Sequence, residues 1–106
     1  MWLFTKNSFV SIVQHREQPD DVLVRARVKK HLVRIFPEMA EEIWHDNEAD
    51  YPWRLIVSKQ ALAGRVSAYI LQSLDYDNFK AAQETNELAW THFLHAVWAE
   101  GVRLQK

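Results

Sequence analysis

Two arginines project from one side of a predicted strand, and their side chains are of the kind that binds anions. Residues 22–28, VLVRARV, alternate apolar and polar positions, which places Arg25 and Arg27 together on one face of a half-buried antiparallel strand. Arg54, on a later predicted strand, is expected on the corresponding face. Guanidinium groups hold phosphate or carboxylate oxygens through paired hydrogen bonds. Arg25, Arg27 and Arg54, here called the arginine face, are therefore the best candidate binding site.

Basic and aromatic residues are expected around the arginine face. His15 or Arg16 is predicted to approach it across a hairpin, and Tyr51 and Trp53 are predicted at its edge. Interleaved aromatics are compatible with single-stranded nucleic acid. However, a net charge of −1 and a pI near 6.5 lack the strongly basic footprint of a nucleic-acid-binding domain. The alternative is a solvated face whose arginines pair with acids, and those acids are Asp50, Asp75 and Asp77.

A second cluster lies in the predicted turn at residues 75–80, DYDNFK. It brings a tyrosine, an amide and a lysine close together in the sequence, and all three are residue types found in enzyme sites. The residues from which a small enzyme site could be assembled are His15, Arg25, Tyr76, Asn78 and Lys80.

Other chemistry finds little support. The chain has no cysteine, which excludes disulfides and thiolate catalysis, and both of its glycines lie in helical patterns, which excludes a phosphate-cradling loop. Ser11 and His15 lie about 13 Å apart along a strand, too far for a nucleophile and its base. His92 and His95 share a helix face, but a third metal ligand would have to come from elsewhere in the chain, such as His31, His45 or Glu87. We therefore predict neither a metal nor a cofactor.

The length and composition are those of one globular domain. The chain has 106 residues, of which 48% are hydrophobic and 25% charged. The N-terminal region has no apolar run of the length that a signal peptide or membrane span needs, so we expect a cytoplasmic protein without a membrane partner. Residues 1–37 carry seven Lys or Arg against three acids, whereas residues 38–51 carry six acids and no Lys or Arg.

The hydrophobic patterns predict alternating strands and helices. A short opening strand and a longer one fall within residues 2–16, and a further strand falls at 22–28 before a helix at 29–36 that ends at Pro37. Strands at 42–46 and 53–57 precede a second helix that begins after Ser58, a good N-cap. The turn at 75–80 is expected to contain one short helix before a last helix at 86–104.

The order of these elements suggests an internal repeat of one structural unit. Residues 22–36 shifted by thirty fall on 52–66, which places Lys29 on Lys59. We therefore predict a single α+β domain over residues 1–106 with pseudo-repeats at 9–37 and 42–74 and a C-terminal helical segment at 75–106. Its fold is expected to be a two-layer, ferredoxin-like sandwich in which a four-stranded, mainly antiparallel sheet (ββα repeated twice) carries helices on one face, plus the C-terminal helix.

The last predicted helix is apolar over more than half of its circumference. Such a helix needs cover on two sides, which leads us to expect a homodimer. Most of the five tryptophans are expected in the core, with Trp44 as the exception on an edge strand. The apolar residues of the last helix are Trp90, Phe93, Leu94, Val97, Trp98, Val102 and Leu104.

Several segments spread over the chain resemble a family of small uncharacterised bacterial and phage-borne proteins. The matching segments are Phe4-Thr5, Phe9-Val10-Ser11-Ile12-Val13 with His15-Arg16, Val24-Arg25-Ala26-Arg27, Ala49-Asp50-Tyr51 with Arg54, Asp75 to Lys80, and Val97-Trp98. Ser8 stands where the family pattern has glycine, and Asp77 where it has proline. The resemblance implies no activity and no residue roles.

These observations favour a non-enzymatic interaction module. It is expected to self-associate through its aromatic last helix and to use the arginine face, with His15, Tyr76, Asn78 and Lys80 as further candidates, for a protein or small anionic partner. The alternatives are a small nucleic-acid-binding domain that uses the same arginines, and a small enzyme with its site at the 75–80 turn.

Overall fold

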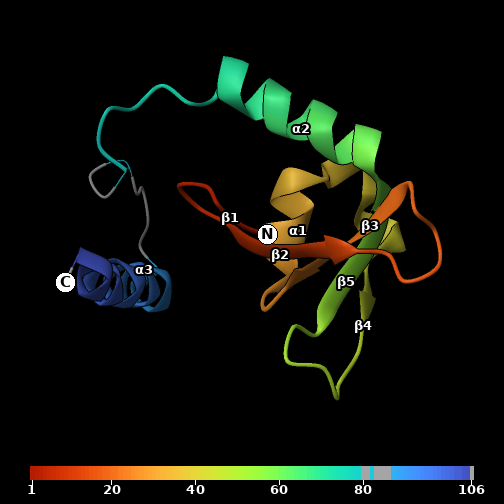
Figure 1. The fold of residues 1–106 in the computed structure, drawn as a ribbon, viewed down its shortest axis with the longest axis horizontal. Helices are drawn as coiled ribbons and strands as arrows, with labels where there is room; N and C mark the ends of the chain where they lie inside the picture. The colour runs from red at the N-terminus through yellow and green to blue at the C-terminus, as the bar shows by residue number, and fades with distance from the viewer. Residues whose placement is uncertain (80–81, 83–86, 106) are drawn as a thin grey trace.

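The structure is a computed structural model that describes residues 1–79, 82 and 87–105, and it confirms an α+β fold with an antiparallel sheet. Figure 1 shows the sheet with α1 and α2 close to it and α3 at one end of the molecule. The elements are β1 (Trp2–Phe4), β2 (Phe9–Gln14), β3 (Asp21–Ala26), α1 (Lys29–Ile35), the 3₁₀ helix η1 (Pro37–Glu42), β4 (Trp44–His45), β5 (Trp53–Ser58), α2 (Lys59–Gln72), α3 (Leu88–Gly101) and the 3₁₀ helix η2 (Val102–Gln105).

The sheet has five strands in the order β1-β2-β3-β5-β4, so the expectation of four strands was wrong. The additional strand is β1, which pairs with β2 along its whole length through partners such as Leu3 and Val10. Every neighbouring pair is antiparallel. The ferredoxin-like expectation was also wrong, because that fold follows a β-α-β-β-α-β order with crossovers, whereas here hairpins precede each helix.

One face of the sheet carries the main hydrophobic core. Alternate residues of β2, β3 and β5 point to this inner face, where α1 and α2 cover them. Val24, Leu32 and Leu55 are among the most deeply buried side chains of this core. The buried members are Val10, Ile12, Val22, Val24, Ala26, Leu32, Ile35, Phe36, Leu55, Val57 and Leu62.

The two helices on the inner face begin thirty residues apart, but the strands before them do not follow the same spacing. The amide of Ala61 donates to the Ser58 hydroxyl at 3.0 Å, which confirms Ser58 as the N-cap of α2. A sequence shift of thirty residues aligns Val24, which faces inward, with Arg54, which faces outward. Equivalent faces of the two strands therefore align only with an odd shift. The reason is that β5 runs directly into α2, whereas Arg27 and Val28 separate β3 from α1.

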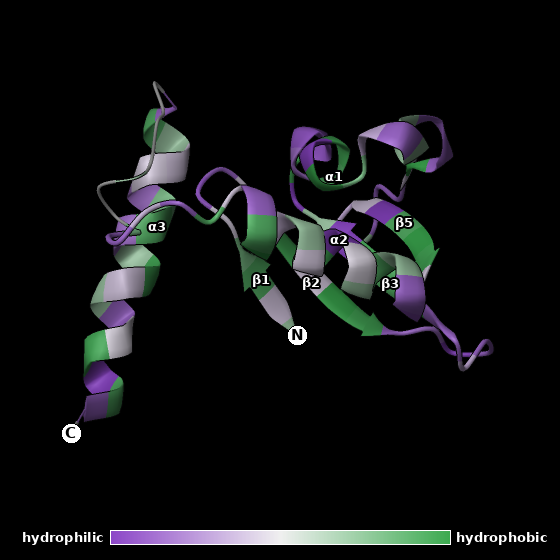
Figure 2. Ribbon diagram, turned by 90° about the horizontal axis from the view of Figure 1, so that it is seen from above, coloured by the Kyte–Doolittle hydropathy of each residue, from purple (hydrophilic) through white to green (hydrophobic). Residues whose placement is uncertain are grey.

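The last helix packs against the opposite, outer face of the sheet. Figure 2 shows α3 beyond β1, with β2 and β3 farther away. Its buried residues Trp90 and Leu94 join Phe9 and Tyr51 in a second hydrophobic cluster. The helix is shorter than the expected 86–104, because the chain tightens into η2 after Gly101. Residues 75–79 form no helix, contrary to expectation, and the rest of that turn lies outside the described residues.

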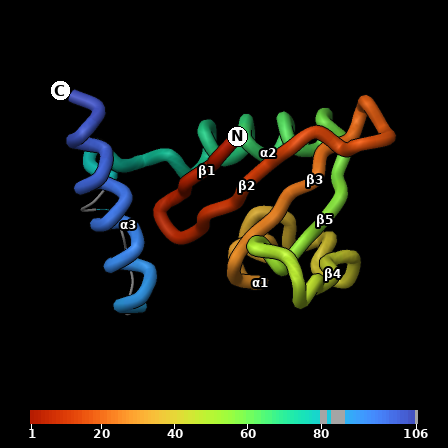
Figure 3. The backbone as a smooth tube through the Cα atoms, turned by 60° about the horizontal axis from the view of Figure 1, so that its bottom comes forward, coloured from red at the N-terminus to blue at the C-terminus, as the bar shows by residue number. Residues whose placement is uncertain are grey.

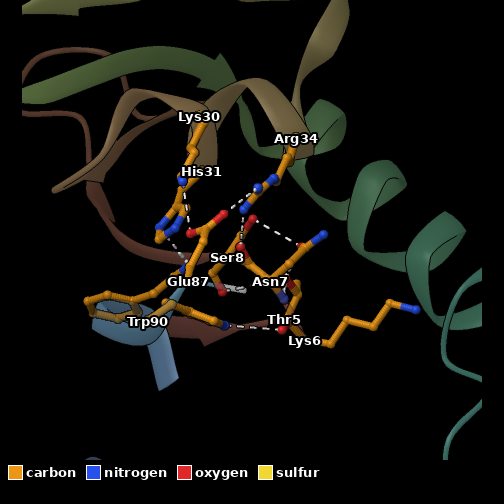
Figure 4. Close-up of polar contacts among 10 residues, drawn as sticks. Thr5, Lys6, Asn7, Ser8, Lys30, His31, Arg34, Glu87 and Trp90 are labelled. Atoms are coloured by element: carbon orange, nitrogen blue, oxygen red, sulfur yellow. Dashed lines mark hydrogen bonds and ion pairs between the residues drawn. The ribbon is translucent and has the colours of Figure 1, made fainter. Parts of the chain in front are cut away.

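Polar contacts fix the start of α3 to α1 and to the β1–β2 turn (Figure 4). Glu87 lies 2.8 Å from the Lys30 ammonium and 3.3 Å from the Arg34 guanidinium. The Trp90 indole N–H donates to the Lys6 carbonyl at 3.2 Å, and the ring meets buried His31 edge-on at 5.0 Å. The helix is therefore attached at its first turn.

The side chain of His31 is neutral at this attachment site of α3. Its Nδ1 accepts a hydrogen bond from the Phe9 amide at 3.3 Å, which a doubly protonated ring could not do. Burial is the main cause that lowers the pKa of His31, and Arg34 and Lys30 act in the same direction, whereas the Glu87 carboxylate opposes it. Protonation is therefore more favourable in the unfolded chain than in the folded one.

Because the folded state lowers the pKa of His31, we expect the stability that its neutral ring contributes to be complete above pH ~6.5 and to decrease as pH falls below that value. Melting temperatures measured by circular dichroism from pH 7.5 to 5 test this. His31→Asn keeps an acceptor for the Phe9 amide but cannot titrate, so its melting temperature should fall less on acidification than that of the wild type. His92→Asn, on the exposed side of α3, is the matched control and should follow the wild type. An equally steep acid dependence in His31→Asn would contradict this role.

Candidate anion-binding face

A row of residues crosses all five strands on the outer face of the sheet. Arg25 of β3 lies directly opposite Arg54 of β5, and Ser11 of β2 lies on the other side of Arg25. Trp2 of β1 and Trp44 of β4 continue the row to the two edges. Because partners in an antiparallel ladder point to the same side, all five side chains belong to one face.

The two central arginines make hydrogen bonds to neutral oxygens. Arg25 donates from Nη2 to the Ser11 hydroxyl at 2.8 Å, and Arg54 donates from Nε to the Tyr51 carbonyl at 3.1 Å. Arg27, just beyond the end of β3, donates from Nη1 to the Asp50 carbonyl at 2.8 Å. These bonds orient the guanidinium groups without neutralising their charge.

Tyr51 is the centre of the arginine face. Its buried ring lies 4.9 Å from the Arg25 guanidinium carbon and 4.6 Å from that of Arg27, which makes two cation–π contacts. The ring also meets Phe9, at 6.2 Å between ring centres, and the backbone amide of Tyr51 donates to the Asp50 carboxylate at 2.9 Å. The sheet arginines and the loop that precedes β5 are thus joined through one aromatic ring.

The charge of this face has no acidic partner within the described part of the chain. The ion pairs found there involve Lys30, Arg34, Arg65 and Arg103, and none involves the arginine face. The alternative, in which the arginine face pairs with Asp50, Asp75 or Asp77, is therefore not found among the described residues, and the hydrogen bond of Arg27 to Asp50 is to the carbonyl. The buried Nε of Arg25 has no hydrogen-bond acceptor, which leaves one guanidinium donor unsatisfied.

His15 does not belong to the arginine face, contrary to expectation. Arg25 is paired with Ser11, and His15 follows four residues later, about 13 Å further along the hairpin. Its Nδ1 accepts hydrogen bonds from the amides of Glu17 and Gln18 at 3.1 and 3.0 Å, so it stabilises the β2–β3 turn. Figure 3 shows that turn at the opposite end of the molecule from α3.

The residues of the 75–80 turn are also separate from the arginine face. Tyr76 lines a cavity of about 350 Å³ between β1 and the second half of α2, and Lys80 lies outside the described residues. Burial, with Tyr69 as the second cause, raises the pKa of Tyr76 to about 12, so its phenol stays protonated at neutral pH. The Asn78 carbonyl accepts a backbone hydrogen bond from Ala82 at 3.0 Å. The proposed enzyme constellation is thus not assembled around His15 and Arg25.

The tryptophans differ from expectation, and two of them extend the candidate site. Trp90 is the one fully buried indole, whereas Trp2 is 63% exposed and Trp44, the predicted exception, is 41% exposed. Trp53 faces the inner side, where its ring meets His45 at 4.4 Å, and so does not edge the arginine face. Trp2 and Ser11 were missed because their places in the row depend on how β2 pairs with β1 and with β3, which no local pattern reveals.

Neither a metal site nor a membrane span is found in the parts of the chain that the structure covers. Across residues 1–79, 82 and 87–105, no three His, Asp or Glu side chains gather closely enough to hold a metal ion. His92 and His95 are both exposed on α3. Of the helices described, none is long and apolar enough to cross a membrane.

Comparison with known proteins finds no match: no family model, no curated protein and no solved structure is similar to this chain. The resemblance to a family of small uncharacterised proteins therefore stays a prediction, and the arginine face is interpreted from its own geometry.

If Tyr51 anchors the arginines by its ring, the ring and not its hydroxyl should carry the effect. We expect Tyr51→Leu to lower the free energy of unfolding by about 1–2 kcal/mol through loss of two cation–π contacts. Tyr51→Phe, the matched control, should stay within about 0.5 kcal/mol of the wild type. Urea denaturation of the three proteins measures both values. Equal stability of the Leu and Phe variants would show that the stacking contributes nothing.

Proposed function

We propose that this protein is a non-enzymatic interaction module that binds an anionic group of a partner on its arginine face. The observation that carries the proposal is the direct pairing of Arg25 with Arg54 across β3 and β5, without a carboxylate between them. Like charges directly opposite each other destabilise a sheet. An oxyanion between the two guanidinium groups would turn that repulsion into two attractive, charge-assisted contacts.

The environment of Arg25 and Arg54 favours an anion as the ligand over a cationic or an apolar partner surface. The Ser11 hydroxyl accepts from one N–H group of Arg25, and the Tyr51 carbonyl accepts from one N–H group of Arg54. These bonds orient both side chains. Each guanidinium has five N–H donors, so several remain for a ligand. Ordered arginines lose less conformational entropy on binding than free ones, which favours affinity.

We also propose the layer arrangement, the repeat units and the cellular location that are expected from the sequence. We infer a two-layer sandwich in which α1 and α2 form the second layer, with two ββα units at 9–37 and 42–74, and a protein that acts in the cytoplasm. The inner-face core shared by β2, β3, β5 and the two helices supports the layer assignment. No reaction is proposed, because His15 and the 75–80 turn belong to separate parts of the molecule.

We also propose that the module forms a homodimer through the second half of α3. The first half of α3 is covered by the sheet, but Val97 and Trp98 in its second half and Val102 at the start of η2 remain exposed. Trp98 is 59% exposed although it also contacts other residues. A contiguous apolar helix surface of this kind is typical of a protein–protein contact.

The anion proposal predicts that pyrophosphate binds to the purified protein in phosphate-free buffer, raises its melting temperature and gives a saturating calorimetric titration. Arg25→Gln and Arg54→Gln should each weaken binding at least tenfold, because a charge-assisted hydrogen bond contributes about 1.5–3 kcal/mol. Arg16→Gln, an exposed arginine in the β2–β3 turn, makes the same change in net charge and should bind as the wild type does. Equal weakening by all three substitutions would reveal unspecific attraction and exclude a built site.

The dimer proposal predicts a concentration-dependent dimer in sedimentation equilibrium. Trp98→Glu should shift the protein to monomer, since a carboxylate would be buried without a partner at the contact. Leu71→Glu, on an 81% exposed side chain of α2, is the matched control and should dimerise normally. A wild type that stays monomeric at every concentration would contradict the dimer.

A further inference from the structure

We propose that the ligand of the arginine face is a single-stranded nucleic acid, which runs across the five strands from Trp2 to Trp44. This inference rests on the proposed function, because it takes the phosphate groups as the anions that Arg25 and Arg54 hold. The register places the residues in the order Trp2, Ser11, Arg25, Arg54, Trp44, one from each strand. The face therefore presents an indole at each end and guanidinium groups at its centre.

The dimensions of this row suit a short single strand. Neighbouring strands lie about 4.8 Å apart, so four steps across the sheet separate the Trp2 and Trp44 backbones by about 19 Å. A track of this length matches the lower end, about four nucleotides, of the site sizes found in domains that bind single strands. The rigid sheet sets the spacing between the two aromatic rings and the charges.

Both terminal indoles have free surface on which a base could stack. Trp2 is 63% exposed and is supported on one side by Phe9, which its ring meets at 5.5 Å and 84°. Trp44 is 41% exposed on edge strand β4. Stacking on aromatic rings together with contacts between guanidinium groups and phosphates is how proteins bind single strands without reading their sequence.

Two carboxylates of the loop beside the face are bound by backbone amides of that loop. The Asp50 carboxylate accepts from the Tyr51 amide at 2.9 Å, and the Asp46 carboxylate accepts from the Glu48 amide at 3.0 Å. Both carboxylates thus point back to their own loop. Because none of the ion pairs found among the described residues involves the arginine face, a protein with a net charge of −1 can still present positive charge there.

Two other occupants fit the face less well. A second copy stacked through this face would bring two sets of uncompensated arginines against each other, which is electrostatically unfavourable. An acidic or phosphorylated peptide would use the arginines, but it would have no need for indoles at both ends of the row. The aromatic residues at the two edges are what favour nucleic acid.

Fluorescence anisotropy with a labelled twelve-nucleotide thymidine strand tests the inference. We expect saturable binding of the single strand at low salt and at least tenfold weaker binding of a duplex of the same length. The logarithm of the affinity should fall with the logarithm of the salt concentration with a slope of about −1.4, because Arg25 and Arg54 contact phosphates of a single strand.

Substitutions then locate the strand on the row. Trp44→Ala and Trp2→Ala should each weaken binding at least threefold, and Arg25→Gln with Arg54→Gln should abolish it. Leu71→Ala, an exposed apolar side chain outside the row, should bind as the wild type does. If the circular dichroism signal of Trp2→Ala shows that this variant does not fold, the binding measured for Trp44→Ala decides whether the indoles contribute. Trp44→Ala is expected to fold, since β4 has only two residues and contributes little to the core.

The outcomes separate this inference from the proposed function. Pyrophosphate binding without strand binding would overturn the nucleic-acid inference and leave anion binding intact. Strand binding that is unaffected by Trp2→Ala and Trp44→Ala would also overturn it, because the phosphates alone would then be recognised. Loss of both ligands would overturn both proposals, and binding of a phosphopeptide in preference to the strand would replace nucleic acid by a protein partner.

Discussion

The pairing of β3 with β5 is the constraint on which the rest of the structure depends. Val24 and Leu55 lie opposite each other and are both buried in the inner core. Because side chains alternate along a strand, a slip of β5 by one residue against β3 would expose Leu55 and bury Arg54. The hydrophobic core therefore determines that two arginines meet on the other face, and the anion-binding proposal follows from how that face compensates their repulsion.

Tyr51 links this compensation to the C-terminal half of the chain. Its ring contacts the guanidinium groups of Arg25 and Arg27 and also joins the cluster that includes Phe9 and Trp90. The same cluster, together with the ion pairs of Glu87, attaches α3 to the sheet. A ligand on the arginine face would therefore act on a ring that also supports α3, and the binding surface and the proposed dimer helix share one aromatic support.

Local patterns predicted the elements well and their assembly less well. The alternation of residues 22–26 correctly separated Val24 from Arg25, and the N-cap at Ser58 marked the start of α2. The short opening strand was recognised, but its membership of the sheet was not, because three residues carry too little pattern to show a partner. That omission hid Trp2 from the site, and the unknown register of β2 with β3 hid Ser11. His15 was misplaced because the distance between two hairpin residues depends on a register that only the folded sheet reveals.

The most direct test of the central claim is a double-mutant cycle in urea with Arg25→Gln and Arg54→Gln, measured with and without saturating pyrophosphate. Without the anion, the two arginines should interact unfavourably. Replacing one arginine by Gln should therefore stabilise the fold more when the other arginine is present than when it has also been replaced. With pyrophosphate, the coupling should change sign, because the anion holds both guanidinium groups at once. A coupling free energy of zero in both conditions would mean that the two charges neither repel each other nor share a ligand, and the account of the arginine face would be contradicted.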